Sequence, residues 1–389
     1  MTAGQPLRCA ELFRRLIRFD TTSRNSNLEL IEFVRDYLAG HGIEARLVHD
    51  ESGTKANLYA TIGPADKPGV ALSGHTDVVP VDGQAWSRDP FALTEADDRL
   101  YGRGACDMKG FIAVALAFVP DFANAPLATP IHLSLSYDEE IGCIGVRRLL
   151  ADLEGLAVRP AACIVGEPTG MQVVRGHKGK LALTCRVRGR ACHSSLVHQG
   201  ANAVEAAAEA VAFLSGLARR YRDEGPFDVD FDPPYSSLQT GRIEGGVAVN
   251  IVPEACCFEI ELRNLPGDDP DDVIAALSAF AEETLLPELR ERAPEAAFEI
   301  DVLSRYPGLA IDESAEIVRL AKSLAGANDT AMVSFGSEAG LFQQAGIPAV
   351  LCGPGQIEQA HKPDEYVAIE QMARCEAFMA RLVERVRLA

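Results

Sequence analysis

The sequence predicts an α/β protein in which a smaller α+β domain is inserted into a larger α/β domain. Three observations lead to this prediction. Short apolar runs alternate with helical segments before about residue 180, strands of period two follow up to about residue 305, and the first pattern then returns. A chain of 389 residues also exceeds one ordinary domain. We therefore expect the larger domain at residues 1–179 and 306–389, and the inserted domain at residues 180–305.

Short, mostly apolar runs of strand length mark the sheet of the larger domain. Strands that are buried on both faces read as continuous runs of this kind. They are expected at residues 70–72, 131–135, 162–165 and 348–351. Helices are expected before, between and after them, at residues 28–38, 111–118, 317–324 and 369–386.

The inserted domain is expected to contain one sheet with a wetter face. Leu181, Leu183 and Cys185 alternate with more polar residues, which is the period of a strand exposed on one side. Similar alternation occurs at residues 258–263 and 298–302. Apolar residues at helical spacing separate these strands, at residues 204–221 and 273–280. The order predicts one sheet and two helices.

Charge and cysteine content restrict the expected partners and compartment. A formal net charge of −19 would repel nucleic acid and anionic membranes, so neither is an expected partner. No stretch approaches the roughly 18 apolar residues of a membrane span, and the N-terminus lacks the apolar segment of a signal peptide. The ten cysteines are scattered without a C-x-x-C pattern, which is typical of reduced thiols. We therefore expect a cytoplasmic protein.

Histidines and acids follow the apolar runs of the larger domain. His75, Glu139, Glu140 and Glu167 come directly after predicted strands. Ligands of open α/β sheets gather beyond the carboxyl ends of the strands, so three separate segments bring these side chains to one edge. A lone residue of this type is usually a solvated loop residue, but three segments that obey the same rule favour a functional site.

Asp107 and His361 complete the candidate set of metal ligands. Two imidazoles and several carboxylates are the ligands that a pair of zinc-like divalent ions needs. Gly102-x-Gly104 before Asp107 could suggest a dinucleotide loop, but Asp107 replaces the third glycine and would repel a pyrophosphate. The sequence also lacks the G-x-S-x-G elbow of many serine hydrolases.

Three acids beside the candidate ligands suggest different tasks. Asp77 lies two residues after His75, where its carboxylate can accept a hydrogen bond from the free ring nitrogen of the histidine. Glu139 and Glu140 are adjacent, so their side chains diverge, and one can hold a metal while the other acts as a general base. The alternative is an acidic turn, since Asp138 precedes them.

The inserted domain carries a second group of candidates. His193 follows the first predicted strand, Asn250 lies in the loop before the second, and Arg263 ends that second strand. An arginine can hold a substrate carboxylate through two parallel hydrogen bonds. The alternative for Arg263 is an ordinary ion pair with Glu261 or Glu259.

These residues lie in motifs that resemble those of the M20 metallopeptidase family, close to its acetylornithine deacetylases and succinyl-diaminopimelate desuccinylases. The motifs occur in family order over nearly the whole chain. They are Ser-Gly-His-Thr-Asp-Val-Val-Pro at residues 73–80, Gly-Arg-Gly through Asp-Met-Lys-Gly at 102–110, Asp-Glu-Glu at 138–140, Gly-Glu-Pro-Thr at 166–169, His-Ser-Ser at 193–195 and His-Lys-Pro-Asp-Glu at 361–365.

The resemblance implies a zinc aminopeptidase-like catalytic domain with an inserted dimerisation or lid domain, and a homodimer. It also implies two divalent metal ions, with zinc expected and cobalt or manganese as alternatives. The implied roles are as follows: Asp107 bridges the ions, His75 and Glu167 hold one, Glu140 and His361 hold the other, Asp77 orients His75, Glu139 is the base, His193 of the partner subunit stabilises the oxyanion, and Arg263 with Asn250 grips the substrate α-carboxylate.

The implied reaction is hydrolysis of the amide of an N-acyl amino acid. Residues 176–179 and 337–340 resemble the acetylornithine branch, which acts in arginine biosynthesis, and Leu341 stands where the desuccinylases carry an arginine. A desuccinylase or another N-acyl amino acid hydrolase of the family is the alternative. Glu338 is predicted to face the side-chain ammonium of the substrate. One departure from the family pattern is Glu261, which stands where an aspartate is expected.

Overall fold

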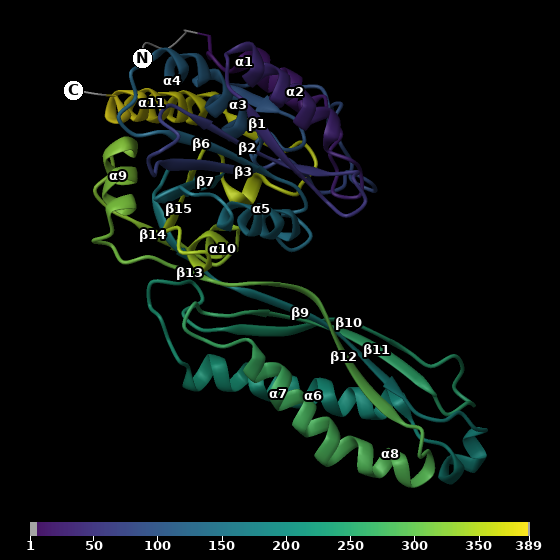
Figure 1. Cartoon of the computed structure of the whole chain (residues 1–389). Coiled ribbons are helices and arrows are strands. Elements are labelled where there is room, and N and C mark those ends of the chain that lie inside the picture. The colour runs from purple at the N-terminus through teal and green to yellow at the C-terminus, as the bar shows by residue number, and fades with distance from the viewer. Residues whose placement is uncertain (1–5, 388–389) are drawn as a thin grey trace. The chain divides into compact units, whose positions relative to one another are not determined.

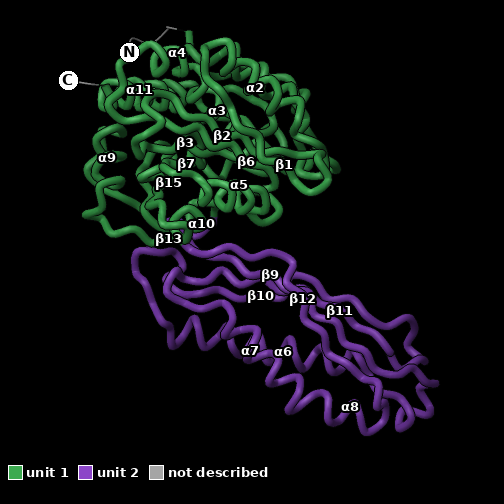
Figure 2. Tube along the Cα trace, viewed as in Figure 1, with its two compact units in different colours: residues 1–176, 309–332, 337–389 green, residues 177–308, 333–336 purple. Residues whose placement is uncertain are grey.

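The computed structural model describes residues 6–387 and divides into two compact units (Figure 2). Unit 1 comprises the chain up to Gly176, Leu309–Met332 and the chain from Ser337 onward. Unit 2 comprises His177–Gly308 and Val333–Gly336, and the predicted boundaries had assigned the second of these segments to the larger domain. No helix within residues 6–387 has both the length and the apolar character needed to cross a membrane.

Unit 1 is built on a mixed sheet with helices on both faces, as the α/β class predicts. Over the described residues this sheet has nine strands in the order β1-β2-β6-β3-β7-β15-β8-β13, with β14 paired to β8. Their bounds are β1 Ala45–His49, β2 Ala56–Ile62, β3 Val70–His75, β6 Ile131–Ser136, β7 Ala162–Pro168, β8 Val174–His177, β13 Leu309–Ala310, β14 Ala331–Val333 and β15 Ala349–Gly353. Strands β6, β3, β7 and β15 pair in parallel, so their carboxyl ends lie at one edge.

Helices cover both faces of this sheet, so its central strands are buried. Every residue of β3 and β6 is buried. Figure 1 shows α1, α3 and α11 on one side of the sheet and α5 and α10 on the other. The helices of unit 1 are α1 Ala10–Ile17, α2 Leu28–Gly40, α3 Lys109–Ala117, α4 Val119–Asn124, α5 Ile144–Glu154, α9 Glu316–Ala325, α10 Ala339–Gln344 and α11 Ile369–Val386.

A small three-stranded sheet joins two distant parts of unit 1. It has the order β16-β5-β4, with β4 at Thr94–Ala96, β5 at Arg99–Tyr101 and β16 at Tyr366–Ala368. Strand β16 pairs antiparallel with β5, with Tyr366 opposite Tyr101. This pairing brings the segment after His361 beside the segment that leads to Asp107.

Unit 2 is a four-stranded antiparallel sheet with helices on one face, in the order β10-β11-β9-β12. Its elements are β9 Lys180–Arg188, α6 Ala203–Glu224, β10 Ser237–Gly245, β11 Ala255–Arg263, α7 Asp271–Phe280, α8 Leu286–Arg292 and β12 Ala297–Tyr306. The apolar side chains of the alternating strands, such as Leu183 and Phe258, are buried with those of the helices.

Besides helix α8, strand β10 is an element of unit 2 that the sequence did not predict. Most of its residues are exposed, and glycines occur at positions 241 and 245. Because few of its side chains are buried, it lacks the apolar alternation by which the other strands were recognised. It forms through its backbone pairing with β11, which sequence periodicity does not report.

Candidate metal centre

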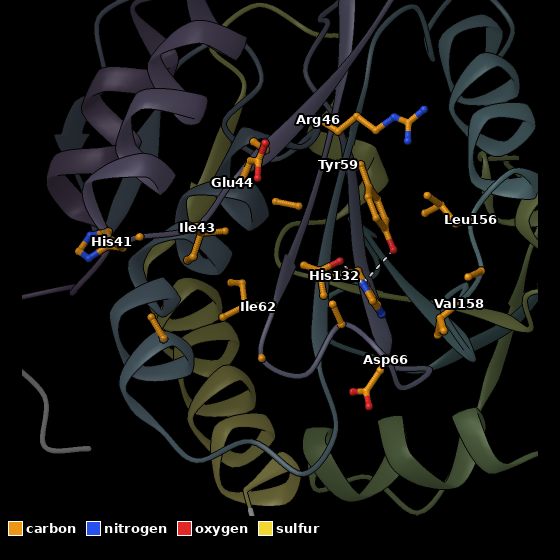
Figure 3. A pocket seen from close by; sticks show the side chains of 18 residues that line it. His41, Ile43, Glu44, Arg46, Tyr59, Ile62, Asp66, His132, Leu156 and Val158 are labelled. Carbon is orange, nitrogen blue, oxygen red and sulfur yellow. Dashed lines mark hydrogen bonds between the residues drawn. The ribbon is translucent and has the colours of Figure 1, made fainter.

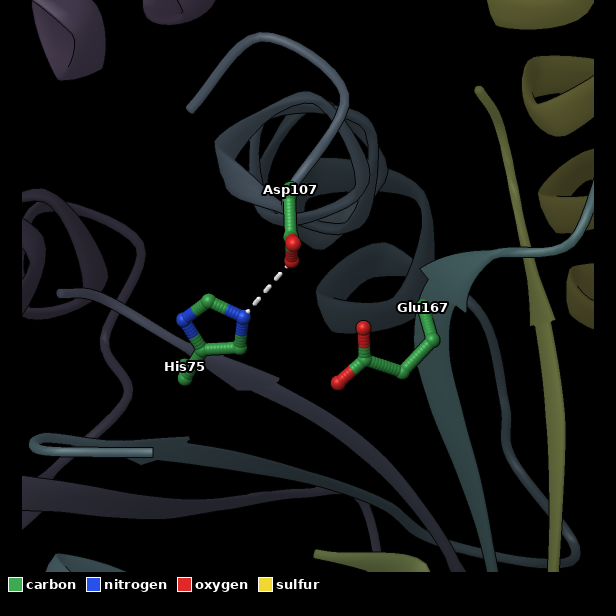
Figure 4. A group of neighbouring side chains, drawn as sticks. All are labelled: His75, Asp107 and Glu167. Atoms are coloured by element: carbon green, nitrogen blue, oxygen red, sulfur yellow. Dashed lines mark hydrogen bonds and ion pairs between the residues drawn. The ribbon is translucent and has the colours of Figure 1, made fainter. Parts of the chain in front are cut away.

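The carboxyl edge of the parallel strands gathers the predicted ligands of unit 1. His75 is the last residue of β3, Glu139 and Glu140 follow β6, and Glu167 lies near the end of β7. Figure 4 shows His75 and Glu167 reaching from these strands toward Asp107, which lies just before α3. Strand direction alone therefore brings three of the five predicted ligand segments together.

Close packing of α3 on the sheet places Asp107 opposite Glu167. Gly166 lies under the ring of Phe111, and a Cβ atom at Gly166 would lie only 2.0 Å from that ring. The glycine therefore permits α3 to approach β7. Because Asp107 lies just before this helix, its position depends on that approach.

The five predicted ligands form two groups that share Asp107. One group is His75, Asp107 and Glu167, and the other is Asp107, Glu140 and His361. Within each group the candidate ligand atoms lie within 4.8 Å of one another. This spacing is close to twice a bond of about 2.0–2.2 Å between zinc and nitrogen or oxygen. Each group can therefore hold one ion.

The two oxygens of Asp107 face different histidines. Its Oδ1 lies 2.9 Å from Nε2 of His75, and its Oδ2 lies 3.3 Å from Nε2 of His361. His361 Nε2 also lies 3.1 Å from Oε2 of Glu140. A carboxylate arranged in this way can serve as a ligand to both ions at once.

The backbone fixes the tautomer of His75. Its Nδ1 lies 2.9 Å from the main-chain oxygen of Asp77, which only accepts hydrogen bonds. Nδ1 therefore carries a proton, which leaves Nε2 as the ring nitrogen that would bind an ion. The carboxylate of Asp77, which is the predicted partner, also faces this nitrogen, with its Oδ1 3.6 Å from Nδ1. The carbonyl and the carboxylate of Asp77 therefore both lie on the Nδ1 side of the ring.

The carboxylate of Asp77 holds the turn that carries Glu139 and Glu140. It accepts hydrogen bonds from the main-chain N–H of Glu139 at 3.0 Å, from that of Glu140 at 3.3 Å and from the hydroxyl of Ser23 at 2.7 Å. Ser23 lies far from the motifs in the chain, so no motif pointed to it. Asp77 therefore positions both glutamates.

Glu139 has the environment expected of a general base. Its removal from water raises its pKa to about 8, although the nearby His75 lowers it and the charges of Glu140 and Asp107 raise it further. The buried thiol of Cys143 lies 3.3 Å from its Oε1 and donates to it. A base whose pKa is near neutral is well matched to proton transfer at physiological pH.

Glu167 gives the most direct sign that a cation belongs here. It is buried, and its Oε1 has no hydrogen-bond partner. Burial raises its pKa well above the usual value, and the charge of Asp107 raises it further. An unpaired buried carboxylate oxygen is costly unless a positive charge compensates it. The donor set thus fits a divalent ion.

The remaining members of the two groups compete for protons. The carboxylates of Asp107 and Glu140 raise the pKa of His361 to about 11, while burial raises that of Glu140 to about 7. Burial tends to raise the pKa of Asp107, but its contacts with His361 and His75 lower that pKa overall. A bound dication would favour the deprotonated form of each ligand, so metal binding here releases protons.

Glu338 does not have the environment predicted for it. Its carboxylate is fully buried and accepts hydrogen bonds from the hydroxyls of Ser73, at 2.6 Å, and Ser136, at 2.7 Å. These hydroxyls belong to β3 and β6, so Glu338 ties two strands together beneath the ligand edge. This placement contradicts the predicted contact with a substrate ammonium, because both oxygens are already bonded and none is exposed.

The other three predicted residues belong to unit 2. Arg263 donates from Nε to Oε1 of Glu261 at 2.9 Å and from Nη1 to the hydroxyl of Tyr306 at 2.8 Å. The ion pair with Glu261 is the alternative that the sequence left open. His193 and Asn250 are both exposed, and the backbone of Asn250 accepts from the N–H of Ser194.

Unit 1 also has a cavity of about 1070 Å³ that contains neither ligand group (Figure 3). It lies near the beginning of β6, where Nδ1 of His132 lies 2.8 Å from the hydroxyl of Tyr59. Burial lowers the pKa of His132 to about 4, so its ring is neutral at physiological pH. Both candidate ion groups therefore lie at the other end of these strands, away from this cavity.

Comparison with known proteins identifies the family. The model of peptidase family M20/M25/M40 matches residues 71–385. The chain belongs to this family. It is 39% identical to an acetylornithine deacetylase of Myxococcus xanthus, over 95% of this chain and 94% of that protein. It is 35% identical to an acetylornithine deacetylase of Proteus mirabilis strain HI4320, over 97% of each.

Solved structures of the M20 family share its fold. An M20 family metallo-carboxypeptidase from Sulfolobus solfataricus aligns with a TM-score of 0.77, over 97% of this chain and 98% of that one. Its sequence is 20% identical, so this likeness concerns the fold alone. The predicted family and fold class are confirmed, and as an M20 protein the chain is a hydrolase.

Proposed function

We propose that this protein hydrolyses N2-acetyl-L-ornithine to L-ornithine and acetate. The observation that carries the choice of substrate is the 39% identity, over nearly the whole chain, to a protein named acetylornithine deacetylase. The shared Asp107, with a candidate ion site on each side, supports a reaction that uses two divalent ions. We propose zinc, with cobalt and manganese as the alternatives.

The residues of unit 1 would divide the work between binding and proton transfer. Asp107, with His75 and Glu167 on one side and Glu140 and His361 on the other, would hold the ions. When bound, such ions polarise an acyl carbonyl and lower the pKa of a water molecule to about 7.

Glu139 would move the proton during hydrolysis. It takes a proton from the attacking water as the water oxygen bonds to the acyl carbon. It then returns that proton to the amine nitrogen as the carbon–nitrogen bond breaks. Asp77 supports this role because it holds the main-chain N–H groups of Glu139 and Glu140.

The inserted unit would supply the groups that hold the substrate. Arg263 and Asn250 would bind its α-carboxylate, and His193 of the partner subunit would stabilise the negative charge on the acyl oxygen. Arg263 then exchanges its present partner Glu261 for the substrate. This arrangement requires a homodimer. Ten free thiols, as observed, are typical of a reducing compartment, which supports a cytoplasmic location.

The test compares substrates on the metal-loaded full-length protein. We expect N2-acetylornithine to have a higher kcat/KM than N-succinyl-diaminopimelate and than other N-acetyl amino acids, with activity lost on chelation and restored by zinc or cobalt. A higher kcat/KM for the succinylated substrate would show instead that the protein is a desuccinylase. Undiminished activity after complete metal removal would refute the mechanism.

A further inference from the structure

Glu365 is a buried carboxylate that belongs to neither candidate ion group but organises the turn carrying Asp107. Its Oε1 accepts from the main-chain N–H of Cys106 at 2.9 Å and of Asp107 at 3.2 Å. Its Oε2 accepts from the N–H of Gly104 at 3.0 Å and from Nη1 of Arg103 at 2.7 Å. One side chain thus satisfies four donors of a single turn.

This turn depends on such contacts because it has no regular secondary structure. Residues 103–108 lie between β5 and α3, so neither a strand nor a helix fixes Asp107. Gly104 adopts a φ of +78°, and a Cβ there would lie 2.7 Å from Val78. A non-glycine residue would be strained at this position. The hydrogen bonds that the carboxylate of Glu365 accepts hold the backbone N–H of Asp107 in place.

Glu365 also belongs to the segment that carries His361. The backbone of this segment is unusual, because His361 itself has a φ of +61°, in the left-handed region. Gln84 holds it from the other side: its Nε2 donates to the main-chain oxygen of His361 at 3.1 Å, and its Oε1 accepts from Nη2 of Arg103 at 2.5 Å. Arg103 is itself buried and paired with Glu365. The network is therefore a closed connection between the turn of Asp107 and the loop of His361.

We propose that Glu365 is a positioning residue that sets the spacing between Asp107 and His361, and thereby selectively maintains the ion site formed by Asp107, Glu140 and His361. This inference rests on the proposed two-ion centre. Two of the three ligands of that site depend on the network, whereas the site of His75, Asp107 and Glu167 has two ligands on strands. Loss of Glu365 therefore weakens one site far more than the other.

The test variant is Glu365→Gln, which keeps the shape of the side chain. Its amide NH₂ has to face either the N–H groups of Cys106 and Asp107 or those of Gly104 and Arg103, so donor meets donor. The matched control is Glu376→Gln. Glu376 is also a buried carboxylate of unit 1, and it accepts from the main-chain N–H of Cys9 at 2.9 Å, away from both ligand groups.

The measurement is titration of metal-depleted full-length protein with zinc, followed by calorimetry and metal analysis. Wild type and Glu376→Gln are expected to bind two ions per chain. Glu365→Gln is expected to bind one ion normally and the other about 10–100-fold more weakly, the usual range for a lost partner of a metal ligand. A general loss of stability would weaken both binding steps together, so it can be told apart from a selective effect on one ion site.

Each outcome decides either the inference or the two-ion centre on which it rests. Two unchanged binding steps in Glu365→Gln, or equal weakening of both, overturn the inference while leaving the proposed function intact. Failure of the wild type to bind two ions instead overturns the two-ion centre itself. If Glu365→Gln does not fold, Gln84→Ala takes its place, because Gln84 is only half-buried and its loss cuts the connection to His361. Weakening of one step alone supports the inference, and no change in either step contradicts it.

Discussion

The ligand edge of unit 1 and the open face of the unit 2 sheet use charged residues in opposite ways. At the ligand edge, His75 and Asp107 are 1% and 6% exposed, and several carboxylates crowd together with few cations. On the unit 2 sheet, Arg186 pairs with Asp301 across β9 and β12, with 52% and 60% of their side chains exposed. Buried acids in excess raise the free energy of the fold unless a cation joins them.

This difference in burial separates charged residues that serve catalysis from charged residues that serve solubility. Exposed pairs contribute little to stability, whereas a cluster of buried acids costs free energy and so marks a candidate functional site. Substitutions at the ligand edge should therefore change catalysis by orders of magnitude, and substitutions on the unit 2 sheet should change stability by fractions of a kcal/mol.

The largest effect is expected from Glu139→Gln. The amide keeps the shape of the side chain but accepts no proton from water, so kcat should fall by about 10²–10⁴-fold. Both ions should remain bound, since Glu139 belongs to neither ligand group. The measurement is steady-state kinetics beside metal analysis. A near-normal kcat in this variant would show that Glu139 is not the general base.

His193 offers the sharpest test of the link between the two units. His193→Ala should lower kcat by about 10²–10³-fold if its ring stabilises the acyl oxygen. If His193 acts in the partner's site, mixing this variant with Glu139→Gln subunits should restore activity, because hybrid dimers contain one intact site. No recovery on mixing, with subunit exchange verified, would show that His193 does not act across the interface.

His132 should make the stability of unit 1 depend on pH. Its pKa is about 4 when folded and 6.5 ordinarily, so between these values the unfolded chain binds the proton first. Above pH 6.5 the residue contributes nothing to the pH dependence, and as the pH falls to 4 the folded state loses up to about 3 kcal/mol, at 1.36 kcal/mol per pKa unit. His132→Asn should remove this loss. Urea unfolding of both proteins between pH 4 and 8 measures it, and parallel curves would contradict the prediction.

The smallest effect is expected on the unit 2 sheet. Asp301→Asn breaks the exposed pair with Arg186 and should change the free energy of unfolding by less than about 1 kcal/mol, without a change in kcat. Chemical denaturation and kinetics measure both. A large loss of activity would mean that the exposed face takes part in catalysis.

The sequence predicted best what strand direction determines. His75 and Glu167 were found because each follows an apolar run, and parallel strands necessarily bring such ends together. Asp107 and His361 lie on irregular segments, so their convergence depends on the packing of α3 and on the pairing of β16 with β5. Their pairing in two ion sites was implied by family resemblance and not by spacing.

The sequence could not predict partners that are distant in the chain or belong to the backbone. Asp77 is predicted to orient the ring of His75, and its carboxylate also binds two main-chain N–H groups and the hydroxyl of Ser23. Glu338 was assigned to the substrate, but two serines of neighbouring strands hold it. In both cases a short motif identified a functional acid, and only the folded backbone could show which groups it binds.

The most direct test of the two-ion centre is anomalous X-ray scattering at the zinc edge, from crystals of protein that is active on N2-acetylornithine. Two peaks are expected, one among His75, Asp107 and Glu167 and the other among Asp107, Glu140 and His361. Fully active crystals with no peak at either position, or with zinc bound only elsewhere, would contradict the central claim that one shared aspartate holds the centre together.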